Sequence, residues 1–141
     1  MKAVLSGVLL AVTVLTVFSC ASAPTKPLGP GEVRLLRMDF PDPSEVRKNS
    51  RYTVDIKYEA QGGPEITRVC IQWTGYTLNC VKALDYGNGL LGADVVAPSA
   101  VGSYAVKAYV YYTRDGKMEQ SNVVEAPVQV KGEKPPQTQT R

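Results

Sequence analysis

Histidine is absent from the 141-residue chain. The absence removes the commonest general base and the commonest transition-metal ligand, so neither a Ser/His/Asp or Cys/His catalytic site nor a His-containing zinc site can be built. Three cysteines, Cys20, Cys70 and Cys80, are too few for a four-cysteine zinc knuckle. The formal net charge of +3 is small. No run of basic residues is interleaved with aromatic residues, so we expect no nucleic-acid partner.

A long apolar run occurs once, at the start of the chain. Met1 and Lys2 precede Ala3–Phe18, sixteen residues without a charge. This run is shorter than the roughly 20 apolar residues that cross a bilayer. A short positive start, an apolar middle and then small residues are typical of a secretory signal peptide. We therefore expect export, with residues 1–19 as the signal peptide.

The end of this run resembles the lipobox of bacterial lipoproteins. Val17-Phe18-Ser19-Cys20 has an aliphatic residue at −3, a small residue at −1 and then the cysteine, although Phe18 departs from the commoner small or aliphatic residue. The resemblance implies cleavage before Cys20 and acylation of Cys20, with chains such as palmitate. It also implies that Ala21 sorts the protein to the outer membrane, facing the periplasm or the surface. The alternative is ordinary secretion, with a cut after Ala21 or at residues 21–23.

Both flanks of the central region are polar and rich in proline. Ala21–Gly31 holds three prolines and two glycines with no hydrophobic period. With the lipidated Cys20 it makes a predicted flexible tether over residues 20–31. At the other end, residues 132–141, "GEKPPQTQTR", indicate a disordered polar tail.

Residues 32–131 alternate apolar and polar side chains with period two and show no sustained helical spacing. In Arg51–Glu59, the clearest case, Tyr52, Val54, Ile56 and Tyr58 share one face. Val33–Phe40 switches face midway, with Val33 and Leu35 followed by Leu36, Met38 and Phe40, which is typical of a β-bulge or of a strand that crosses between sheets. About seven short strands in about 100 residues predict an all-β fold, a single antiparallel β-sandwich. The other strands are expected over Thr67–Thr74, Leu90–Ala97, Ser103–Thr113 and Val123–Lys131.

The last part of this region resembles bacterial immunoglobulin-like or fibronectin type III-like domains. The stretch "PSAVGSYAVKAYVYYTRDGKMEQSNVVEAPVQV" has a Gly-x-Tyr opening its first strand, a turn, and a valine-rich final strand. The resemblance implies that Tyr104 occupies the tyrosine-corner position and that Trp73 is the core tryptophan. It covers roughly Val33–Val130 and names no activity. Cys70 and Cys80 are much closer together than the two cysteines of antibody domains.

The cysteine count becomes even if Cys20 is acylated, which leaves Cys70 and Cys80 to form a disulfide in an oxidising compartment. A hairpin centred near residue 75 would place them side by side. Direct pairing would, however, set Ile71 of the core face opposite Asn79, so a bulge or a wider loop is expected. A redox-active pair is disfavoured, because there is no C-x-x-C spacing or neighbouring histidine.

One face of the predicted sheet carries the candidate binding residues. In immunoglobulin-like topology the third, penultimate and last strands share a sheet. On the outer face of that sheet, two tyrosines flanked by cationic and amide groups could stack on a sugar or bind a peptide. Cross-strand pairs that only cover the sheet surface are the simpler interpretation of the same residues. The candidate residues are Arg68, Gln72, Lys107, Tyr109 and Tyr111.

We therefore predict a membrane-anchored cell-envelope lipoprotein that carries a non-catalytic binding or structural module, with an envelope protein or a glycan as partner. The alternative is a subunit of a larger envelope assembly that recruits partners by strand addition at a sheet edge. Asp39, Asp42 and Glu45 are close in sequence, but turn geometry explains them, and an enzyme is not expected. They and Asp85 with Asn88 supply too few ligands for calcium, so no metal or cofactor is expected.

Overall fold

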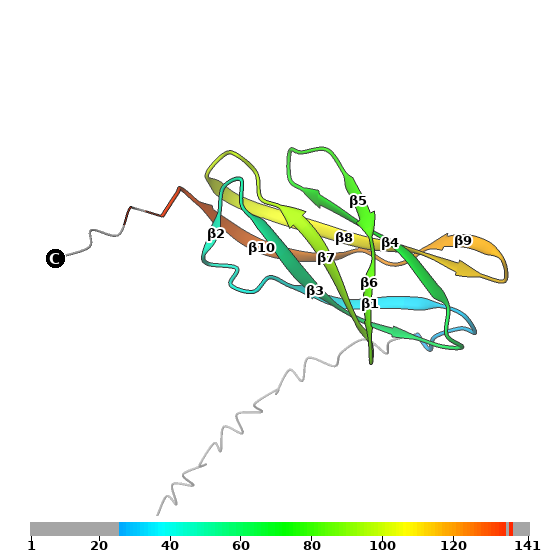
Figure 1. Cartoon of the computed structure of the whole chain (residues 1–141). Helices are drawn as coiled ribbons and strands as arrows, with labels where there is room; N and C mark the ends of the chain where they lie inside the picture. The colour runs from blue at the N-terminus through cyan, green and yellow to red at the C-terminus, as the bar shows by residue number, and fades with distance from the viewer. Residues whose placement is uncertain (1–25, 135, 137–141) are drawn as a thin grey trace, which may run out of the picture.

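The computed structural model describes residues 26–134 and 136, so the predicted signal peptide and Cys20 lie outside the described residues. Ten strands make up the fold (Figure 1). In this part of the chain no helix is long and apolar enough to cross a membrane. The strands are β1 (Val33–Asp39), β2 (Val46–Arg47), β3 (Arg51–Ala60), β4 (Glu65–Trp73), β5 (Asn79–Lys82), β6 (Leu84–Gly87), β7 (Leu90–Val96), β8 (Gly102–Arg114), β9 (Lys117–Gln120) and β10 (Val124–Lys131).

The strands form two sheets. One has the order β1-β3-β7-β6, and the other has the order β2-β10-β8-β4-β5 with β9 paired to β8. All neighbours are antiparallel except β2, which runs parallel to β10. Once the short strands β2, β5 and β9 are set aside, these are the ABED and GFC sheets of the immunoglobulin fold. The predicted immunoglobulin-like β-sandwich is confirmed, with three short strands more than the seven expected.

The core lies between the two sheets and follows the predicted alternation. Trp73 packs edge-to-face against Phe40 and Tyr104, with ring centroids 5.6 and 5.7 Å away. The Tyr104 hydroxyl donates a hydrogen bond of 2.8 Å to the carbonyl of Ala100, which confirms the tyrosine corner. Fully buried side chains come from both sheets and include Val54, Ile56, Leu91, Val69, Val106, Val110 and Val130.

The first strand contains the predicted bulge. The register between β1 and β3 shifts between Leu35 and Arg37, and Leu36 is the extra residue. The sequence pattern groups Leu36 with Met38 and Phe40, but Leu36 is 55% exposed whereas Met38 and Phe40 are buried, because a bulged residue leaves the alternation of its strand. The side-chain amide of Asn122 accepts from the Leu35 N–H (2.8 Å) and donates to the Leu35 carbonyl (2.9 Å). Asn122 thereby links the edge of one sheet to the segment between β9 and β10 of the other.

The chain enters the sandwich at one end and leaves it at the other. Val33 of β1 pairs with Ala60, so the chain enters beside the β3–β4 turn. Residues 26–31, the end of the predicted tether, contact this end of the sandwich. The Gly31 N–H donates to the Gln61 carbonyl at 2.8 Å. Strand β10 finishes at the opposite end of the sandwich, beside the β7–β8 loop (Figure 1).

Candidate functional site

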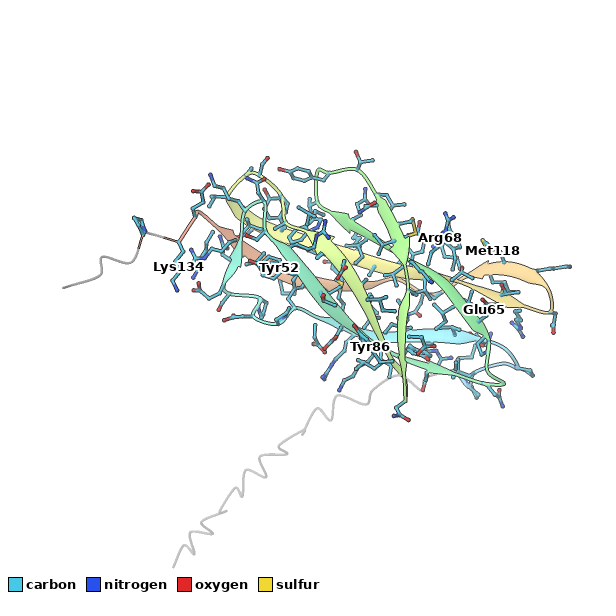
Figure 2. The ribbon with its side chains drawn as sticks, viewed as in Figure 1. Tyr52, Glu65, Arg68, Tyr86, Met118 and Lys134 are labelled. Atoms are coloured by element: carbon cyan, nitrogen blue, oxygen red, sulfur yellow. A yellow bond between two sulfur atoms is a disulfide. The ribbon has the colours of Figure 1, made fainter. Side chains whose placement is uncertain are left out.

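The outer face of the six-stranded sheet brings the candidate binding residues together. Arg68 of β4 pairs with Tyr111 of β8, and Gln72 of β4 pairs with Lys107 of β8. Because alternate residues of paired strands share a face, these four side chains and Tyr109 lie on one surface. Arg68 is labelled on β4 in Figure 2. We call this surface the tyrosine face.

The two tyrosines of this face contact each other. The rings of Tyr109 and Tyr111 are perpendicular, with centroids 5.5 Å apart. The Tyr111 hydroxyl raises the pKa of Tyr109. Two polar side chains beside them already have partners within the protein. The Lys107 Nζ lies 3.9 Å from Glu125 Oε2, and the Gln72 amide donates a hydrogen bond to the Tyr76 carbonyl. The arrangement offers aromatic area flanked by cations and an amide.

A disulfide belongs to this face, because Cys70 alternates with Arg68 and Gln72 along β4 and pairs with Tyr109 of β8. Cys70 and Cys80 are bonded, which confirms the predicted pair. They are direct partners in the β4–β5 register, with Ile71 opposite Asn79 and without the bulge that was one of the two expected solutions; residues 74–78 form the loop. No bulge is needed, because β5 is an edge strand, where Asn79 is exposed rather than placed in the core.

Acidic residues considered for catalysis or calcium binding accept hydrogen bonds from neighbouring residues. Asp42 accepts hydrogen bonds from the Ser44 hydroxyl and N–H, and these bonds lower its pKa. Glu45 accepts from the Lys131 Nζ at 2.6 Å, a contact that lowers the pKa of Glu45. Asp85 accepts from the Gly87 N–H at 2.9 Å. Over residues 26–134 and 136, no three Cys, Asp or Glu side chains are grouped to hold a metal ion.

A groove at one end of the sandwich was missed by the sequence analysis. It has a volume of about 380 Å³ and lies between the β4–β5 and β7–β8 loops, at the end opposite to the one where the chain enters. Trp73 and Tyr76 line it together with Asn49, Thr77, Asn79 and Ser99. These residues come from separate segments, and no local motif marks them. The only available signal was Tyr76, an aromatic residue in a predicted loop.

Neither a protein-family model nor a curated protein sequence matches the chain. Solved structures that resemble it include the following three. A CARDB domain from Pyrococcus furiosus, in complex with di-metal ions, is 17% identical over 78% of this chain and 98% of its own, with a TM-score of 0.46. A cohesin module of a family 33 glycoside hydrolase from Clostridium perfringens is 16% identical over 71% and 99%, with a TM-score of 0.38. Fibronectin(III)-like modules of CbhA from Clostridium thermocellum are 21% identical over 66% and 93%, with a TM-score of 0.36.

Proposed function

We propose that this chain is a non-catalytic binding module of the bacterial cell envelope, anchored through lipid on Cys20, and that the tyrosine face contacts an envelope protein. The disulfide supports an oxidising compartment, because such bonds persist outside the cytosol. It also leaves Cys20 as the one cysteine without a partner in that pair, in the position that the lipobox requires.

The place where the chain enters the sandwich supports a defined orientation of the sandwich relative to the membrane. Six residue steps separate Cys20 from Lys26, the first described residue, and they reach about 20 Å when fully extended. Arg34 donates to the Lys26 carbonyl, and the Gly29 N–H donates to Glu32 Oε2, so residues 26–31 are held against the sandwich. An anchor at Cys20 would keep the β3–β4 end near the membrane. The opposite end, near Lys134 in Figure 2, would then point away from it.

The observation that carries the binding role is the tyrosine pair itself. Two contacting aromatic rings on the outer face of the central strand β8, beside Arg68 and Lys107, have the composition of protein-contact surfaces. Tyrosine and arginine are enriched where interfaces derive most of their binding energy, since they bring large contact areas at low entropic cost. The positive side chains favour a partner with acidic groups.

Two measurements test the proposal. A labelled fatty acid should be incorporated into the wild-type chain in cells and lost in Cys20→Ser; an unlabelled wild type would refute the anchor. A photo-crosslinking amino acid at position 109 or 111 should capture the same protein. At Thr53, on the outer face of the other sheet, it should capture none. Equal capture at Thr53 and Tyr109 would refute a role for the tyrosine face.

Strand addition is a second candidate, because β6 is the edge of the four-stranded sheet and all four of its residues are exposed. Leu84 on this strand is an exposed large apolar residue. Edge strands with unpaired backbone groups accept an extra strand from a partner. A crosslinker at Leu84 discriminates the two candidates: capture at Leu84 without capture at Tyr109 would favour the edge.

A further inference from the structure

Trp73, which lines the groove, has a side-chain hydrogen-bond donor without a partner among the described residues. Trp73 is only 6% exposed, yet its indole N–H donates to no acceptor among the described residues. In the same part of the chain, no fully buried side-chain nitrogen or oxygen lacks a partner. The indole N–H is therefore not fully buried, and Trp73 is one of the residues that line the groove.

The polar side chains around the groove are uncharged and also unused. Asn49, Thr77, Asn79 and Ser99 form no side-chain hydrogen bonds within the region that the structure describes, and no charged side chain lines the groove. Two amides and two hydroxyls supply both donors and acceptors. An ionic ligand, such as a phosphate or a lipid head group, would find no counter-charge there.

Apolar and aromatic surface completes the lining. Tyr76 is 38% exposed at the rim, 5.9 Å from the ring of Tyr104, and Ile71, Val95 and Pro98 form the wall. The volume of about 380 Å³ is at the small end of the range for ligand sites. A compact ligand is required that has an apolar face and several uncharged hydroxyl or amide groups around its rim.

We propose that this groove binds an uncharged sugar unit of a glycan. A sugar ring has apolar C–H surface for the exposed ring of Tyr76, and hydroxyl groups for the uncharged amides and hydroxyls of the lining. An extended peptide fits less well, because peptides added to sandwiches pair their backbone with a strand edge. Here the free groups are side chains from three segments that converge on one hollow. This inference goes beyond the proposed function and does not depend on the lipid or on the tyrosine face.

The chain contains a single tryptophan, so its indole signal reports on the groove without further assignment. The full-length chain, purified in a zwitterionic detergent whose head groups carry no sugar, is titrated with maltotriose, cellotriose and the trimer of N-acetylglucosamine. A neutral hexapeptide of alanine and glutamine is the competing ligand class. We expect at least one sugar to shift the indole N–H resonance and the fluorescence in a saturable manner, with a Kd of about 1 mM or lower.

Variants separate binding from folding. Tyr76→Ala removes the rim aromatic and Asn79→Asp, at an exposed edge position, puts a negative charge into the groove. Each should weaken sugar binding about fivefold or more. Tyr86→Ala, the loss of an exposed tyrosine outside the groove, is the matched control and should bind as wild type does. The proposal is overturned if no sugar shifts the indole signal at about 20 mM, if only the peptide shifts it, or if both groove variants bind normally.

Discussion

Asn122 should contribute more to stability than its exposed position suggests. Its side-chain amide makes two hydrogen bonds to the backbone of Leu35, at 2.8 and 2.9 Å, across the edges of the two sheets. Leu35 is 2% exposed, so its N–H and carbonyl find little water if the amide is removed. A buried group that loses its partner costs about 1–3 kcal/mol. For two groups, we expect Asn122→Ala to lower the free energy of unfolding by about 2–6 kcal/mol.

Urea denaturation followed by circular dichroism measures this change, with the m-value unaltered. Asn79→Ala is the matched control, because Asn79 is an exposed asparagine with no side-chain hydrogen bond among the described residues; it should change stability by less than about 0.5 kcal/mol. Asn122→Asp keeps the acceptor for the Leu35 N–H but loses the donor. At neutral pH this variant should therefore be less stable than wild type. Below about pH 4, where the new carboxyl group is protonated and can donate, its stability should approach that of wild type measured at the same low pH. If Asn122→Ala is within about 0.5 kcal/mol of wild type, the link between the sheets is not stabilising.

Three further predictions concern the disulfide, a turn glycine and acid stability. Replacing Cys70 and Cys80 by alanine should cost about 2.7 kcal/mol in the chain-entropy model, measured by the same denaturation; an unchanged midpoint would contradict it. Gly89→Ala should cost more than Gly63→Ala. Both glycines have positive φ, but a Cβ at Gly89 would lie 2.6 Å from a backbone oxygen, whereas Gly63 has open space. The pKa of Glu45 is lowered by Lys131, so its contribution to stability is present above pH 4.5 and is lost as pH falls through the lower folded-state value. Glu45→Gln should therefore reduce the fall in Tm between about pH 5 and pH 3, and an identical pH profile would refute this.

Local patterns account for the parts of the fold that were predicted correctly. The alternation of Tyr52, Val54, Ile56 and Tyr58 requires a strand with one buried face, whatever it pairs with. The slip after Leu35 requires an irregularity in the same way, and the bulge confirms it. Tyr104 was assigned through the resemblance of Gly-x-Tyr to immunoglobulin-like domains, and its hydroxyl bonds to a carbonyl only four residues away. Each of these features depends on residues that are near neighbours in sequence.

The placement of Asn79 shows where such reasoning ends. The alternation of apolar and polar residues predicted that the position opposite Ile71 lies in the core. The order of strands in the sheet shows instead that β5 is an edge strand, so Asn79 is exposed to solvent. The five residues of the tyrosine face lie on one surface, because this placement needs only the register of two neighbouring strands. Whether that face binds a partner remains a prediction for crosslinking to decide.

The sequence by itself determined the β-sandwich and most of the strand faces, since period-two alternation and turn chemistry act over a few residues. The number of cysteines indicated the pair, and the resemblance indicated the tyrosine corner. Only the tertiary structure decided that Asn122 joins the sheets and that residues 26–31 pack beside Gln61. It alone also placed Asn49, Trp73 and Ser99 around one groove. Those arrangements depend on which distant segments meet when the two sheets close, and no local pattern of side chains encodes such a meeting.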